Sequence, residues 1–219
     1  MDESTPQDTI ERVKKIVNFL SKNTDKNIEI IVVGGTAMSF YGDYRTTMDI
    51  DAEIINCPEN LYKNLLEHLK ENKIQFNIDE DFDSWGMVAM PLGYRERAIP
   101  VYNVGNITVK TLEPIDFIIS KLRRGADIDI NDAEKIVSRN NITEKAIRER
   151  VSKIEFIKTE ETFWFKQRLE MFINEKIKLK QDLSQKTEPK LKPETQSPKP
   201  DAFSKDLQNR LGKSKGWER

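Results

Sequence analysis

Cysteine and histidine are nearly absent from this 219-residue sequence, which contains one of each, Cys57 and His68. A single cysteine excludes an internal disulfide framework and any zinc cluster built from several cysteines. A single histidine makes a histidine-rich zinc site or a Ser-His-Asp triad hard to assemble. We therefore expect Cys57 to be an inert thiol and His68 to be a partly exposed helix residue.

Long hydrophobic runs are also missing. No stretch approaches the roughly 18 apolar residues of a membrane-spanning helix. The first ten residues, MDESTPQDTI, lack the basic start and apolar stretch of a signal peptide. Together with 33% charged residues, these features lead us to expect a cytoplasmic protein with no membrane partner.

Charge is divided unevenly along the chain, whose net charge is −1. Residues 184–219 hold nine basic and five acidic residues, a balance of +4, which leaves −5 for residues 1–183. A body of that sign offers no general attraction for nucleic acid. The proline- and lysine-rich start of the last segment predicts a flexible basic tail. The alternative is that Phe203, Leu207 and Leu211, at spacing four, form a short helix that docks on a partner or on the body.

Hydrophobic periodicity predicts an α/β half followed by a helical half. The expected strands are 28–33 and 48–55, with two or three more around 87–90, 99–102 and 107–112. The expected helices are one from Pro6 with an apolar stripe at spacing three to four, then 36–41, 61–69, 115–124, 131–137, 143–154 and 161–183. Trp85 and Trp164 are expected to be packing anchors.

The richest stretch is 33–51, VGGTAMSFYGDYRTTMDID, in which two glycines follow a strand and precede a helix. Gly34, Gly35 and Thr36 are candidates for seating a phosphate, because glycine lets the backbone approach a bulky anion. Asp49 and Asp51 lie two apart on a strand and so share a face. Two adjacent carboxylates repel, and a divalent cation such as Mg²⁺ relieves that repulsion. Each feature alone is typical of a tight turn or a wet strand face, but their order favours metal-assisted phosphoryl or nucleotidyl transfer.

This pattern resembles the nucleotidyltransferases of the DNA polymerase β superfamily, whose signature is GG or GS, about ten residues, then DxD. Here 13 residues separate Gly35 from Asp49. Arg45 and the two threonines after it are similar to the R-x-T-x-D-x-D variant of the AbiEii-like branch, which includes toxins of AbiE and MenT-type toxin–antitoxin pairs. The resemblance implies a mixed sheet flanked by helices, Mg²⁺ or Mn²⁺ on Asp49 and Asp51, an NTP substrate, and Arg45 on phosphate or acceptor.

A second block, 112–133, LEPIDFIISKLRRGADIDINDA, resembles the family element L-x-P-x-D-L-I-x-x-K-L…R-D-x-x-D. The resemblance implies that Lys121 neutralises triphosphate charge and that Asp129 is a third metal ligand or the general base, with Asp132 and Arg124 as further candidates. The alternatives are an exposed helix lysine for Lys121 and helix capping for the aspartates. The chain departs from the family in lacking a carboxylate on the expected strand 99–102.

The resemblance spans about residues 28–137 and supports a nucleotidyltransferase-like domain at 1–137. The helical pattern and the composition of the rest of the chain predict a helical region at 138–183 and the tail at 184–219. The resemblance implies transfer of an NMP from an NTP to a tRNA or protein acceptor, possible pairing with an antitoxin protein, and a role as a toxin. Two alternatives stay open. One is an inactive module that binds nucleotide or a partner, and the other is a nucleic-acid adaptor that uses the helical half and the tail.

Overall fold

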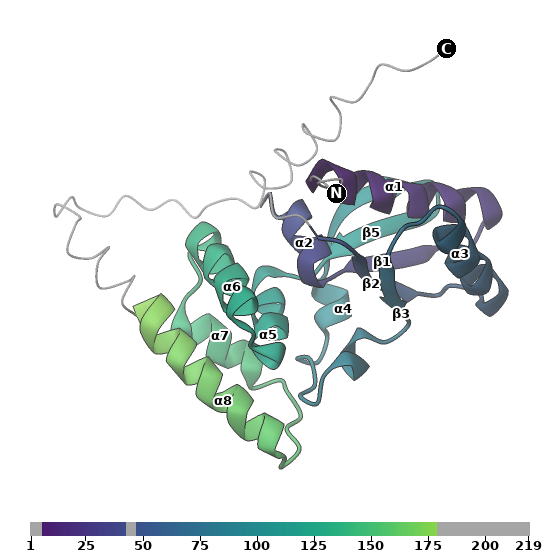
Figure 1. Cartoon of the computed structure of the whole chain (residues 1–219). Helices are drawn as coiled ribbons and strands as arrows, with labels where there is room; N and C mark the ends of the chain where they lie inside the picture. The colour runs from purple at the N-terminus through teal and green to yellow at the C-terminus, as the bar shows by residue number, and fades with distance from the viewer. Residues whose placement is uncertain (1–5, 43–46, 179–219) are drawn as a thin grey trace, which may run out of the picture.

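A five-stranded mixed sheet forms the N-terminal half of the protein in the computed structural model, which describes residues 6–42 and 47–178 (Figure 1). The strand order is β3-β2-β1-β5-β4. The strands are β1 (Ile28–Val32), β2 (Ile50–Ile55), β3 (Phe76–Asp79), β4 (Ile99–Val104) and β5 (Ile107–Thr111). β1 pairs parallel with β5 and antiparallel with β2, β2 pairs parallel with β3, and β4 pairs antiparallel with β5. The predicted α/β class with a mixed, helix-flanked sheet is confirmed.

β1 is the central strand because its sequence suits burial on both faces. Ile30, Ile31 and Val32 are all at most 2% exposed. A continuous β-branched run of this kind is typical of a strand covered on both sides. The run ends at Val33, which precedes the first turn of α2 (Gly34–Phe40). The strand therefore delivers the two glycines to the end of the sheet.

Two amphipathic helices, α1 (Pro6–Asn23) and α3 (Glu59–Glu71), pack together at the sheet (Figure 1). The buried stripe of α1 contains Val13, Val17 and Leu20, at the spacing of a helix face. In α3 the buried residues recur every fourth position, at Leu61, Leu65 and Leu69. Both predicted helices are confirmed.

Four helices form the C-terminal half of the described chain (Figure 1). They are α5 (Pro114–Arg124), α6 (Asp127–Asn140), α7 (Glu144–Val151) and α8 (Glu160–Phe172), and α8 continues into a π-helical turn, Ile173–Lys178. α5 contacts α6, α7 and α8. The expected domain limit at residue 137 falls inside α6, and the division into domains stays a prediction. The expected tail and its apolar stripe lie outside the described residues.

Local details differ from the expected elements at several points. α2 begins at Gly34, two residues earlier than predicted, and β2 begins at Ile50, two residues later. The strand predicted at 87–90 is wrong: this segment is irregular and follows a 3-10 turn, η1 (Phe82–Trp85). The short edge strand β3 was not predicted, and neither was α4 (Tyr94–Arg97).

Within 6–42 and 47–178, every helix is too short or too polar to cross a membrane.

Candidate functional site

Asp51 lies against the first turn of α2. Gly34 has a φ of +54°, and a Cβ atom added there would lie 2.2 Å from the Asp51 Oδ2 atom. The Gly35 N–H donates a hydrogen bond of 3.3 Å to the same oxygen. Residue 34 must therefore be glycine for two reasons, the left-handed backbone and the close approach of the carboxylate. The glycine pair and the second aspartate of the predicted motif form one structural unit.

Thr36 connects the same helix to the start of β2. Its buried hydroxyl accepts a hydrogen bond from the Asp51 N–H at 2.8 Å and lies 3.4 Å from the Asp49 carbonyl oxygen, to which it donates. These contacts hold the aspartate segment against α2. The predicted role of Thr36 in binding phosphate stays a prediction, and its hydroxyl is engaged by the backbone.

The charge of Asp49 acts on Asp51. Asp49 precedes β2 by one residue, and its Oδ1 accepts a hydrogen bond of 3.0 Å from Thr47. Burial and the negative charge of Asp49 raise the pKa of Asp51 to about 6, against the opposing effects of the Gly35 N–H and of Lys121 and Arg124. Such a raised pKa is expected of a carboxylate that lacks a compensating cation. The donor set of two hard oxygen ligands fits Mg²⁺ or Mn²⁺. Among the described residues, no cluster of three or more histidine, cysteine or acidic side chains fits a metal ion.

A pocket of about 440 Å³ opens between the end of the sheet and the helical half. Its walls come from the start of α2, from β2 and β3, from the segment around η1, from α5 and α6, and from α8. The lining includes the candidate residues Gly34, Asp51, Lys121, Arg124 and Asp129. The structure thus brings together two sequence blocks that are about 70 residues apart.

The remaining candidate residues have different positions. Gly35, Thr36 and Asp49 adjoin Asp51 without lining the pocket. Asp132 accepts a hydrogen bond of 2.7 Å from Lys121 and does not itself line this pocket. Arg45 lies outside the described residues, so its predicted role stays a prediction.

Lys121 is buried between two aspartates of α6. Its side chain is 3% exposed, and its Nζ lies 3.2 Å from Asp129 Oδ1 and 2.7 Å from Asp132 Oδ2. The alternative of an exposed helix lysine is therefore wrong. Because both partners lie on the neighbouring helix, the lysine joins α5 to α6 at the edge of the pocket. Its positive charge favours the ionised form of Asp51 and so partly offsets the rise in the pKa of that residue.

Asp129 is fully buried and has four hydrogen-bond donors. Arg124 approaches it in a bidentate manner, with two bonds of 2.6 Å, and Lys121 and the Ala126 N–H supply the others. Burial alone would raise the pKa of Asp129, but Arg124 and Lys121 outweigh burial and lower it. The contact with Ala126 confirms the capping alternative for Asp129. A role as ligand or base would require Arg124 to move, and that role stays a prediction.

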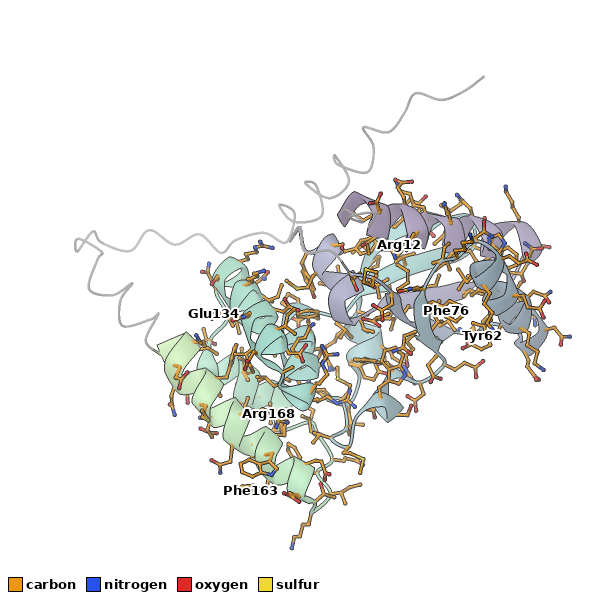
Figure 2. The ribbon with its side chains drawn as sticks, in the orientation of Figure 1. Arg12, Tyr62, Phe76, Glu134, Phe163 and Arg168 are labelled. Carbon is orange, nitrogen blue, oxygen red and sulfur yellow. The ribbon has the colours of Figure 1, made fainter. Side chains whose placement is uncertain are left out.

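The two consecutive arginines at the end of α5 point to different surroundings. The Arg124 side chain is 66% exposed at the pocket. The Arg123 side chain is only 5% exposed and donates to the Asp83 carbonyl at 2.6 Å, which ties the η1 segment to α5. Arg168 of α8 donates to the carbonyls of Leu122 and Arg123, so it lies between α8 and α5 (Figure 2). Of these three arginines, Arg124 has the side chain most available to a ligand.

One notable residue, Glu53, was missed in the sequence, and another, Trp164, was given a wrong role. Glu53 follows Asp49 and Asp51 in the same period of two, a signal that could have identified it. It is fully buried and accepts hydrogen bonds from Arg95 and Tyr94, so it anchors α4 to the sheet. Trp164, expected to be a packing anchor, is 51% exposed and lines the pocket. That expectation was wrong, whereas Trp85 is partly buried against the core as expected.

Comparison with known proteins agrees with this geometry. Residues 8–178 match the model of a family described as nucleotidyltransferase of unknown function (DUF6036). The match spans the sheet, the pocket and all four C-terminal helices. Comparisons with curated proteins and with solved structures gave no match. Because the family match covers well over half of the chain, the protein belongs to this family of nucleotidyltransferases.

Proposed function

We propose that the protein transfers a nucleoside monophosphate from an NTP to a hydroxyl group of an RNA or protein acceptor, with release of pyrophosphate. The observation that carries this proposal is the contact between Gly34 and Asp51 in a pocket that also contains Lys121 and Arg124. Carboxylates for a metal and cations for phosphate are the components that nucleotidyl transfer requires. The pocket volume lies within the range of small-molecule sites.

Each residue of the site has a separate role in the proposed reaction. Asp49 and Asp51 would hold Mg²⁺, which when bound offsets the phosphate charge and lowers the pKa of the attacking hydroxyl. Arg124 exchanges one or both of its bonds to Asp129 for bonds to phosphate oxygens, because its exposed guanidinium suits bidentate contacts. Lys121 remains between Asp129 and Asp132 and contributes its charge at short range. Gly34 leaves room for the Asp51 carboxylate beside α2.

The direct test is incorporation of label from each α-³²P-labelled NTP into total cellular RNA or protein by the full chain with Mg²⁺. We expect the wild type to incorporate label into one acceptor class. The Asp51→Asn variant should lose this incorporation, and the Asp127→Asn variant should retain it. Asp127 is a suitable control because it is an exposed aspartate on α6 outside the pocket lining. Transfer by Asp51→Asn at the wild-type rate would overturn the assigned site.

A catalytically inactive nucleotide-binding module is the second candidate. The observations that favour it are the lack of a three-carboxylate cluster among the described residues and the full set of donors on Asp129. Tight, Mg²⁺-dependent NTP binding without transfer to any acceptor would support this module over the enzyme.

The finer assignment that we propose is an AbiEii/MenT-like toxin. Its support is the similarity of the glycine–aspartate block and of the Lys121 block to that branch. If this is correct, expression of the chain arrests growth, Asp51→Asn abolishes the arrest, and a small protein from an adjacent gene relieves it. Unimpaired growth at high levels of active enzyme would contradict the toxin role.

A further inference from the structure

The pocket has a wall of apolar side chains that are open to solvent. Met87 is 66% exposed and Trp164 is 51% exposed, and both line the pocket together with Trp85. Exposed apolar groups that gather in one place are typical of ligand or partner sites. The same pocket has charged groups at Asp51 and Arg124. A ligand that carries an anionic group and a flat apolar group matches both parts.

Trp164 is held in place by its neighbours on α8. Its indole Nε1 donates to the Glu160 carboxylate at 3.1 Å, and the Phe163 ring meets it edge-on with centroids 5.2 Å apart. Phe163 lies near the start of α8, where Figure 2 labels it. These contacts orient the indole while half of its surface remains exposed. An oriented and exposed aromatic ring is suited to stacking on a nucleobase.

Glu161 lies one turn before Trp164 on the same face of α8, since residues three apart on a helix are neighbours. It also lines the pocket, it is exposed, and it has no hydrogen-bond or ion-pair partner among residues 6–42 and 47–178. Arg168, a further turn along, is occupied by the Leu122 and Arg123 carbonyls. On this face of α8, Glu161 is therefore the charged side chain available to a ligand.

We propose that α8 forms the nucleobase subsite and that this subsite selects guanine. In this arrangement the base stacks on Trp164, and the Glu161 carboxylate accepts two hydrogen bonds from the guanine edge. This inference rests on the proposed function, because it assigns the base of the same nucleotide substrate. The phosphates then extend from α8 toward Arg124 and Asp51.

The hydrogen-bond chemistry of a carboxylate favours guanine. An ionised carboxylate is an acceptor only. Guanine presents a ring N–H next to an exocyclic amino group, so it supplies two adjacent donors. Adenine and cytosine present an amino group next to an unprotonated ring nitrogen, and uracil presents one N–H between two carbonyls. These acceptors would face the carboxylate and repel it.

The test is calorimetry of the full chain with GTP, ATP, CTP and UTP in the presence of Mg²⁺. We expect GTP to bind roughly 5- to 150-fold more tightly than the other three NTPs, because a good bidentate pair to a base is worth about 1–3 kcal/mol. Glu161→Gln should remove most of that preference and change the other affinities by less than about 3-fold. Glu175→Gln is the matched control, since Glu175 is an exposed glutamate outside the pocket lining.

Substitutions of Trp164 test the stacking of the base separately. Trp164→Ala should lower the affinity for all four NTPs by about 10-fold or more, and Trp164→Phe should restore most of the lost affinity. Equal affinity for the four NTPs in the wild type, or a guanine preference that survives Glu161→Gln, would overturn the guanine subsite. If NTP binding still depends on Mg²⁺ in that case, the proposed function is upheld. Absence of Mg²⁺-dependent binding of any NTP would overturn both.

Discussion

The Oδ2 atom of Asp51 lies 2.2 Å from the point where a Cβ atom of residue 34 would be. A glycine at the start of α2 and a carboxylate on β2 are therefore coupled sterically. The coupling explains why a glycine and an aspartate 17 residues later belong to one site. It also means that the backbone of α2 positions the carboxylate on which the proposed metal site depends.

Gly34→Ala should destabilise the protein more than a left-handed backbone alone explains. We expect a loss of about 3 kcal/mol or more in the free energy of unfolding, from backbone strain plus the clash with Asp51. Gly105→Ala is the matched control, because its φ is +57° and no atom lies within 4 Å of an added Cβ. The control should cost about 1 kcal/mol. Equal losses in urea unfolding would show that the Asp51 contact is unimportant.

Asp51 should make the stability of the metal-free protein depend on pH. Its pKa is raised from 3.8 to about 6 in the folded state, so the folded form disfavours the charged carboxylate. Stability should therefore fall as the pH rises from about 4 to about 6. With EDTA, we expect Asp51→Asn to be more stable than the wild type by about 1–2 kcal/mol at about pH 7.5 and nearly equal to it at about pH 4. Urea unfolding at both pH values tests this, and a pH-independent difference would contradict it.

Lys121→Met should lower stability strongly, because it leaves Asp129 and Asp132 buried without the ammonium group that both contact. Removal of one partner of a buried ion pair typically costs about 3–5 kcal/mol. Lys63→Met removes an exposed pair with Glu59 and should stay within about 0.5 kcal/mol. Chemical denaturation compares the two variants. A cost below about 1 kcal/mol for Lys121→Met would show that this buried cluster contributes little to the fold.

Arg124→Ala should affect the ligand more than the fold. Its exposed guanidinium loses a charge-assisted contact with phosphate, worth about 1.5–3 kcal/mol, or roughly 10- to 100-fold in NTP affinity. Asp129 keeps Lys121 and the Ala126 N–H, so stability should fall by about 1 kcal/mol or less. Arg124→Lys should restore part of the affinity, because an ammonium group cannot make the bidentate contact. Wild-type NTP affinity in Arg124→Ala would remove this residue from the phosphate site.

The expected elements were correct where local pattern decides structure. The β-branched run of β1 and the apolar stripes of α1 and α3 were predicted from periodicity, and Gly125 ends α5 with the left-handed backbone expected of a C-terminal glycine. β3 was missed because a four-residue edge strand has little pattern of its own and depends on pairing with β2. The predicted strand at 87–90 was wrong because these residues belong to an irregular segment. Asp83 fixes this segment by accepting hydrogen bonds from the Met90 N–H and from Arg123.

By itself, the sequence determined the glycine–aspartate block, the helix that carries Lys121 and the class of chemistry that these residues suit, since residue type and short spacing decide those features. Only the tertiary structure decided that Lys121 is buried, that Asp129 is held by Arg124, and that Trp164 and Glu161 of α8 share the pocket with Asp51. The physical reason is that burial, ion pairing and the formation of a pocket depend on which faces of distant elements meet. Periodicity identifies the apolar face of each helix, but the partner of that face is decided by the packing of the whole chain.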